Sequence, residues 1–206
     1  MQLHQKTFVE RHDSGHKEWV DIVEITPDIA RDHLDTWWNA NQFRMDWDKE
    51  TADVDYYWSW HHLASNEFSG PGFKQVATRD ASGDVQSAII YRRKASSLLE
   101  KGHFGVFVER LAIAPSNRPW VVTNPRFRGC GSCLLHYAIR DSNLLGFGGR
   151  ALLIPTGSIA KNTYRSMGFR STGVDEGSGS EIWELPPEVA RDILKGAKEQ
   201  GFFYDA

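Results

Sequence analysis

The stretch that decides the fold is residues 126–132, Arg126-Phe127-Arg128-Gly129-Cys130-Gly131-Ser132, which has the spacing R-x-x-G-x-G. A helical pattern follows, because small and apolar residues recur between positions 134 and 145 with a period of 3.6 residues, up to Gly146. Glycines just ahead of a helix let the backbone approach a ligand closely, and the N–H groups of the first helical turn have no partner within the helix. An anion is the natural ligand there, so the stretch predicts a phosphate-binding turn.

The segments around this turn are apolar and short. Residues 105–114 precede it, end at Pro115 and predict a buried strand. After the helix, residues 150–155 predict another strand, and residues 158–169 follow it. Two common phosphate-binding motifs are absent from the sequence: there is no G-x-x-x-x-G-K-[ST], and no G-x-G-x-x-G opens a βαβ unit with an acidic residue about 20 positions later.

With these pieces in this order, the chain resembles the GNAT superfamily of acyl-CoA-dependent N-acetyltransferases. The resemblance covers roughly residues 73–185, while residues 1–65 carry no motif of the family. The matching pieces are the strand at 111–115, the R-x-x-G-x-G turn with its helix, the strand at 152–154, Ala160 with Tyr164 four residues later, and Gly168-Phe169.

The resemblance implies an α+β fold, with a central mixed, mostly antiparallel sheet of six to seven strands flanked by helices. We expect one domain over residues 1–206, in which residues 1–65 form a divergent helical region on the substrate side, residues 73–185 form the family-matching core, and residues 187–206 form a C-terminal helix. The remaining patterns predict a strand at 17–25, a helix from the cap Thr26 to about Phe43, a helix within 53–65, a hairpin of 73–79 with 85–95, and a strand pair at 170–174 and 181–185.

Composition limits the classes of partner. The chain has 206 residues, 40% of them hydrophobic, which is enough for one large core. The net charge of −3 provides no basic field, so a nucleic-acid partner is not expected. No long apolar run and no secretory pattern occurs, so we expect no membrane partner and a cytoplasmic protein. A homodimer and a monomer both remain open.

The only two cysteines, Cys130 and Cys133, have C-x-x-C spacing. A redox dithiol or half of a zinc site is one interpretation, but the sequence offers no second ligand pair for zinc. We favour the alternative, in which Cys130 fills the variable position between two glycines and Cys133 packs as a small residue in the first helical turn. No metal site is predicted.

The resemblance implies acetyl-CoA as co-substrate. The turn would hold its diphosphate with added charge from two arginines, and the strand before the turn would pair with its pantetheine arm. The family's asparagine seven residues before the tyrosine falls on Gly157, so Ser158 or Asn162 is expected to replace that contact. The expected cofactor-binding residues are Leu111, Ala112, Ile113, Arg126, Phe127, Arg128, Gly129, Cys130, Gly131, Ser132, Ser158 and Asn162.

Two residues are expected to carry the chemistry. By resemblance, Tyr164 lies near the cofactor sulfur and donates a proton to it. Glu109 is the candidate base, because alternation along its strand predicts that it shares a face with Leu111 and Ile113. It could equally pair with Arg110 or another cation, and His61 and Asp46 are rivals for the role.

The predicted function is transfer of an acetyl group from acetyl-CoA to a primary amine, by direct transfer in a ternary complex. The acceptor is a small-molecule or peptide amine that the sequence does not identify. The alternative is a GNAT-fold protein that binds acyl-CoA or regulates a partner without turnover, which the missing asparagine and a ten-residue insertion at 116–125 keep open. We expect most N-terminal aromatic residues to be core, and one or two of Trp38, Trp47, Tyr57 and Trp58 to face a substrate.

Overall fold

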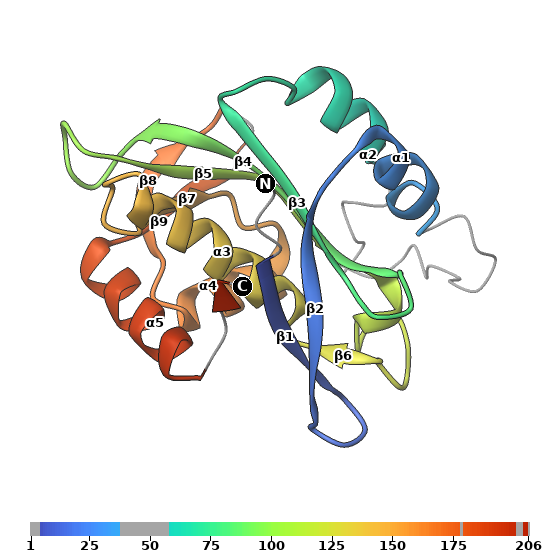
Figure 1. Ribbon diagram of the computed structural model, residues 1–206. Coiled ribbons are helices and arrows are strands. Elements are labelled where there is room, and N and C mark those ends of the chain that lie inside the picture. Colours follow the sequence, from blue (N-terminus) through green and yellow to red (C-terminus); the bar gives the residue numbers. More distant parts are fainter. Residues whose placement is uncertain (1–4, 38–57, 178, 201–203, 206) are drawn as a thin grey trace.

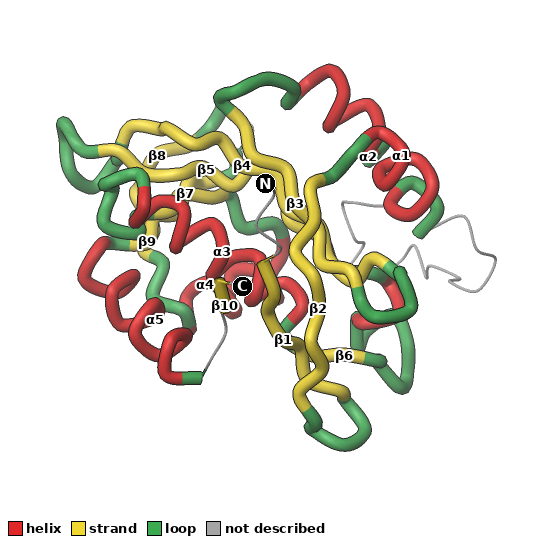
Figure 2. Tube along the Cα trace, in the orientation of Figure 1, coloured by secondary structure: helices red, strands yellow, loops and turns green. Residues whose placement is uncertain are grey.

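The computed structural model describes residues 5–37, 58–177, 179–200 and 204–205, and these form one mixed ten-stranded sheet with helices on both faces (Figures 1 and 2). The strand order is β10-β1-β2-β3-β4-β5-β7-β9-β8, with β6 paired to β1. The strands are β1 Gln5–Arg11, β2 Lys17–Glu24, β3 Phe73–Arg79, β4 Val85–Ser96, β5 Phe104–Ile113, β6 Phe127–Arg128, β7 Ala151–Leu153, β8 Arg170–Asp175, β9 Glu181–Leu185 and β10 Tyr204–Asp205.

Short helical segments and three longer helices connect these strands. The segments are α1 Pro27–Ile29, η1 Ala30–Leu34, α2 Trp60–His62, η3 Leu63–Glu67, η4 Pro115–Asn117, α3 Cys130–Leu144, α4 Gly157–Ser166 and α5 Pro187–Glu199. The expected mixed, mostly antiparallel sheet is confirmed, since β5 and β7 form the one parallel pair among the described strands. The expected count of six to seven strands is wrong, because β1, β6 and β10 enlarge the sheet at the N-terminal side.

The sheet buries a core on each face. The first core lies under α3 and α5 and contains Leu134 and Ala190, both fully buried. The second core lies under η1, α2 and η3 and contains Leu34 and Trp60. Figure 1 shows these two groups of helices apart from each other, with β3 and β4 running between them. A feature that lies on one face of the sheet therefore has different neighbours from a feature on the other face.

Helix α3 has the form that its sequence predicts. Gly129 precedes it with φ of 79°, a left-handed conformation that favours glycine. Of the side chains expected to face the core, Leu134, Leu135, Ala138, Ile139 and Ser142 are buried, while Leu145 is half-buried and packs against the same core. The N-terminus of this helix is therefore fixed against the sheet by its own apolar face.

The N-terminal region differs from the expected helical one. Residues 5–24 form the hairpin of β1 and β2, and the helix that Thr26 caps ends at Leu34 instead of continuing to Phe43. Buried and exposed residues do not alternate along β1, because Thr7, Phe8 and Val9 are buried in succession. The expected helix within 53–65 begins only at Trp60. Trp38, Asp46, Trp47 and Tyr57 lie outside the described residues.

A buried ion pair fixes the paired ends of β7 and β9. The Arg150 guanidinium lies against the Glu184 carboxylate, and both side chains are almost fully buried. Glu184 also accepts hydrogen bonds from the Ser97 hydroxyl at 2.6 Å and from the backbone N–H of Leu98 at 2.8 Å. This network ties the end of β9 to the connection between β4 and β5.

None of the helices in the described part of the chain has the length and apolar character needed to cross a membrane.

Candidate active site

A cavity opens where β5 and β7 separate. These two strands pair only over Val106–Val108 and Ala151–Leu153. Beyond this point β5 continues to Ile113 with β4 as its paired neighbour, so its other edge borders a cavity of about 980 Å³. Backbone N–H and C=O groups on an unpaired strand edge can bind an extended ligand that carries amide groups.

The turn before α3 forms one end of the cavity. Gly129, Gly131 and Ser132 line it, and a Cβ added at Gly129 would meet no atom within 4 Å. At Gly131 an added Cβ would lie 3.3 Å from Cγ2 of Ile113, so a side chain there would crowd the wall of the cavity. The first-turn N–H groups of α3 therefore face an open space that suits an anion.

Strand β6 brings the N-terminal hairpin to this turn. Arg128 pairs with Glu10 of β1, and its guanidinium Nη2 lies 2.9 Å from Nε2 of His12. Both side chains line the cavity. His12 was not predicted as a site residue, because the contact depends on a strand pairing between residues more than 100 positions apart.

Two expected cofactor-binding residues point elsewhere. Arg126 lies outside the cavity lining, and its Nη2 contacts the buried carboxylate of Asp80 at 3.0 Å in the turn between β3 and β4. The Oδ1 atom of Asn162 accepts a hydrogen bond from Arg165 on the exposed side of α4. Ser158 does line the cavity, so it is the remaining candidate for the contact that the family's asparagine makes.

A β-bulge places Glu109 on the face opposite to the expected one. Ile90 of β4 pairs with Arg110 and the next residue, Tyr91, pairs with Val108, so Glu109 is the extra residue in β5. The alternation of the strand therefore shifts by one position. Val106 and Val108 belong to the first core before the bulge, and Leu111 and Ile113 pack against that core after it.

The partner of Glu109 identifies its face. Its Oε1 atom accepts from Nε of Arg92 at 3.0 Å and lies 2.9 Å from Nη2 of the same guanidinium. Arg92 follows Tyr91 of the first core, so it points to the other face, and Glu109 lies with it. Burial raises the pKa of Glu109, while Arg92 acts in the opposite direction. Glu109 still lines the cavity, but from the face that carries the second core.

Tyr164 lies in the cavity wall, on the face of the sheet that carries the first core. It projects from α4, packs against the first core and meets the ring of Phe169 at a centroid distance of 5.5 Å. Burial raises the pKa of its hydroxyl to about 12, so the phenol keeps its proton at neutral pH. Such a group can donate a proton to a thiolate but cannot act as a base.

The remaining expected residues also meet at the cavity. Its lining includes Glu109, Leu111, Ala112, Ile113, Phe127, Arg128, Gly129, Cys130, Gly131, Ser132, Ser158 and Tyr164. The insertion at 116–125 adds Asn117, Arg118 and Trp120 to the lining. Arg118 is buried, and its Nε atom donates to the carbonyl oxygen of Ile113 at 2.8 Å, which fixes the end of β5.

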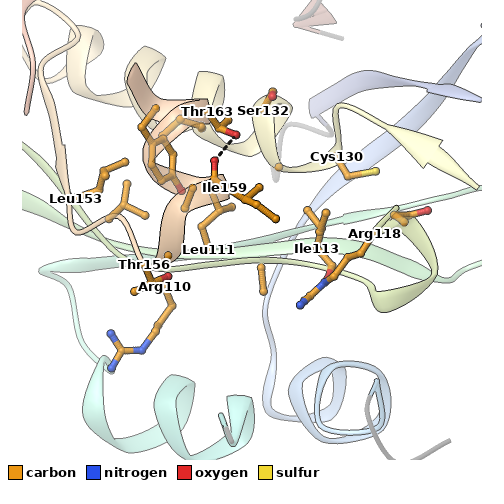
Figure 3. A pocket seen from close by; sticks show the side chains of 18 of the residues that line it. Arg110, Leu111, Ile113, Arg118, Cys130, Ser132, Leu153, Thr156, Ile159 and Thr163 are labelled. Atoms are coloured by element: carbon orange, nitrogen blue, oxygen red, sulfur yellow. Dashed lines mark hydrogen bonds between the residues drawn. The ribbon is translucent and has the colours of Figure 1, made fainter. Parts of the chain in front are cut away.

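Figure 3 shows the two directions of β5 side chains. Leu111 and Ile113 point toward the labelled residues of α3 and α4, while Arg110 points away from them toward the helix that follows Trp58. Trp58 lines the cavity on the face of the sheet that carries the second core. It belongs to the group of aromatic residues of which one or two are expected to face a substrate. The cavity thus has walls from both faces of the sheet.

The two cysteines have the environment of packed residues. Both are free and buried, and burial raises the pKa of Cys130 to about 12 and raises that of Cys133 well above its usual value. A reactive thiol needs a lowered pKa, so this environment disfavours thiolate chemistry. Among the described residues no three His, Cys, Asp or Glu side chains gather as a metal site requires.

These thiols should be unreactive in the native protein. At about pH 8 an aromatic disulfide reagent is expected to label neither cysteine before unfolding and both in denaturant, because the reagent attacks the exposed thiolate. Absorbance of the released thiol measures the labelling. Fast labelling of the folded protein would restore the redox interpretation.

Comparison with known proteins identifies the fold. No family model matches the chain, and no curated protein does. Solved structures do match: a histone acetyltransferase HPA2 and related acetyltransferase from Corynebacterium glutamicum is 16% identical, with TM-score 0.51 and coverage of 82% of this chain and 96% of that one. A GCN5-related N-acetyltransferase from Kribbella flavida is 16% identical, with TM-score 0.52 and coverage of 81% and 97%.

A third match, the AtaTR structure bound with acetyl-CoA, is 17% identical, with TM-score 0.53 and coverage of 85% of this chain and 98% of that one. At such low identities the likeness establishes the fold. The chain has the fold of the GCN5-related N-acetyltransferases, which confirms at this level the resemblance seen in the sequence.

Proposed function

We propose that this protein is an N-acetyltransferase that moves an acetyl group from acetyl-CoA to a primary amine by direct transfer in a ternary complex. The observation that carries the proposal is a single cavity that joins the N-terminus of α3, the unpaired edge of β5, Tyr164 and Glu109. The fold likeness to acetyltransferases supports it, and one of those neighbours is bound with acetyl-CoA.

The residues present fit this co-substrate. The open turn at Gly129 leaves room for a diphosphate against the first-turn N–H groups, with the charge of Arg128 beside it. The edge of β5 from Leu111 to Ile113 offers backbone partners for the pantetheine amides. When bound, acetyl-CoA supplies an acetyl group activated as a thioester.

The chain supplies the proton transfers. The nitrogen of the acceptor forms a bond to the acetyl carbon, the carbon–sulfur bond breaks, and Tyr164 donates its proton to the departing sulfur. Glu109 accepts the proton that the amine loses, a role for which its raised pKa suits it. The two groups reach the reacting atoms from opposite faces of the sheet, so they need not compete for one position.

Release of free thiol from acetyl-CoA in the presence of a panel of amines tests the proposal. Thiol release that depends on one class of amine, with the acetylated amine found by mass spectrometry, is the expected result. Binding of acetyl-CoA without thiol release from any amine would favour the alternative, a protein that binds acyl-CoA without turnover.

Replacing Gly131 with valine tests the turn separately. Acetyl-CoA at a hundredfold excess over its dissociation constant should stabilise the wild type by about 2.7 kcal/mol. Gly131→Val should abolish this gain, because the new side chain would crowd Ile113 and fill the space at the turn. Thermal unfolding with and without acetyl-CoA measures the effect.

The matched control is Gly196→Val in α5, where an added Cβ meets no atom within 4 Å and the residue does not line the cavity. Its stabilisation by acetyl-CoA should equal that of the wild type. A Gly131→Val protein that is folded by circular dichroism and keeps the full stabilisation would show that acetyl-CoA binds elsewhere.

A further inference from the structure

Resting on the proposed function, we infer that the acceptor is an amine that also carries a carboxylate, as an amino acid does, and that Arg110 binds this carboxylate. Arg110 lines the cavity from the face of the second core, the face on which Glu109 also lies. The bulge at Glu109 is what brings these two consecutive residues to one face.

The Arg110 guanidinium is held in place by aromatic rings. Its central carbon lies 5.2 Å from the ring centroid of Trp58 and 5.3 Å from that of Phe68. Its Nη1 atom donates to the backbone carbonyl oxygen of Glu109 at 2.7 Å. A planar group fixed in this way loses little rotational freedom when a ligand binds, which favours recognition.

One edge of this guanidinium has no hydrogen bond among the described residues. The Nε atom is buried without a hydrogen-bond partner, and Nη2 forms an ion pair with Oε1 of Glu67 at 3.8 Å, which is beyond hydrogen-bond distance. Nε and Nη2 lie side by side, and together they match the two oxygens of a carboxylate. A buried donor without a partner is unfavourable, so this edge is suited to a ligand.

The other two arginines of the cavity lining are engaged differently. Arg118 directs the same edge, Nε and Nη2, to the carbonyl oxygen of Ile113. Arg128 belongs to the turn before α3 and contacts His12. Arg110 is therefore the arginine of this lining whose bidentate edge is available on the acceptor side.

Glu109 provides the complementary charge for the amine. Both of its contacts with Arg92 fall on Oε1, so Oε2 carries neither of them. A zwitterionic acceptor would place its amino group toward Glu109 and its carboxylate toward Arg110. An amine that lacks the carboxylate would leave the edge of Arg110 without a partner and would bind more weakly.

The test compares three matched forms of each acceptor. The twenty standard L-amino acids, their carboxamides and their decarboxylated amines are assayed for thiol release from acetyl-CoA. We expect at least one free acid to exceed its amide and amine in kcat/KM by about 100-fold, the range for losing a charge-assisted bidentate contact. Equal rates for the three forms would overturn the inference.

Variants assign the effect to Arg110. Arg110→Gln should lower kcat/KM for the free acid by about 100-fold, mainly through KM, and change the rates of the amide and amine by less than about threefold. Arg110→Lys should recover only part of the loss, because an ammonium lacks the planar edge. An equal loss for all three forms would mean that Arg110 is only structural.

The control variant is Arg93→Gln. This substitution also removes one positive charge, but from the adjacent strand β4, where Arg93 pairs with Asp141 outside the cavity lining. It should not alter the preference for the free acid over its amide and amine. Binding of acetyl-CoA is measured in every variant by thermal shift. If the protein binds acetyl-CoA but releases thiol with none of these acceptors, the carboxylate inference alone is overturned. If the protein does not bind acetyl-CoA, the proposed function itself is overturned.

Discussion

Replacing Tyr164 with phenylalanine is expected to lower kcat by about 10²-fold while the dissociation constant of acetyl-CoA stays near that of the wild type. The substitution keeps the ring that packs against Phe169 and removes only the hydroxyl. A departing thiolate with few water molecules around it is poorly solvated, so loss of the proton donor should slow the chemical step. Single-turnover kinetics and equilibrium binding measure the two quantities separately.

Tyr137→Phe is the matched control. Tyr137 lies on α3, packs against the first core and has a pKa raised by burial, but it does not line the cavity. Its removal should leave kcat unchanged. A Tyr164→Phe protein with full kcat would exclude Tyr164 as the acid, and one that no longer binds acetyl-CoA would assign it a packing role.

The same hydroxyl predicts a pH dependence. The neutral phenol is the donor, so its contribution is present below its pKa and is lost as the pH rises through that value. Burial raises this pKa to about 12, so kcat should not fall near the usual tyrosine value of about 10. The high-pH decline caused by Tyr164 should be absent in Tyr164→Phe.

Replacing Glu184 with glutamine is expected to lower the free energy of unfolding by about 3–5 kcal/mol, the range for breaking a buried ion pair. The change removes the fully buried counter-charge of the Arg150 guanidinium and leaves it only the half-exposed carboxylate of Glu100. It also weakens the acceptor of the hydrogen bonds from Ser97 and Leu98. Urea denaturation, followed by tryptophan fluorescence, measures the loss.

An exposed pair provides the comparison. Glu188 lies 3.2 Å from Arg170, and about half of each side chain is accessible, so Glu188→Gln should cost less than about 1 kcal/mol. Similar small losses for both variants would show that Glu184 is not important for stability. Replacing Arg150 and Glu184 together with apolar residues should recover much of the loss, since no buried charge then lacks a partner.

The sequence was sufficient for the parts of the fold that local rules determine. The turn at Gly129 and helix α3 follow from glycine placement and a period of 3.6 residues, and both occur as expected. Thr26 accepts the capping hydrogen bond from Ile29 at 3.2 Å, as its position before Pro27 predicts. Each of these features depends on residues that are near one another in the chain.

The features that the sequence did not reveal depend on distant pairings. Strand β6 is two residues long and exists because β1 lies beside it. The face of Glu109 depends on a bulge, which alternation cannot show because the shift appears only in the register with β4. Arg126 was expected to bind the ligand. Its guanidinium instead contacts the carboxylate of Asp80, which lies in a hairpin turn 46 positions earlier in the chain.

The two-faced cavity has a consequence for the order of kinetic events. Leu111 and Ile113 bound it from one face of β5, while Arg110 bounds it from the other (Figure 3). A cofactor held against α3 and an amine held near Trp58 would then approach the reaction from opposite sides, so that neither ligand obstructs the departure of the other. The acetylated product could then be released before or after coenzyme A. Initial-rate kinetics would show random-order rather than compulsory-order binding of the two substrates.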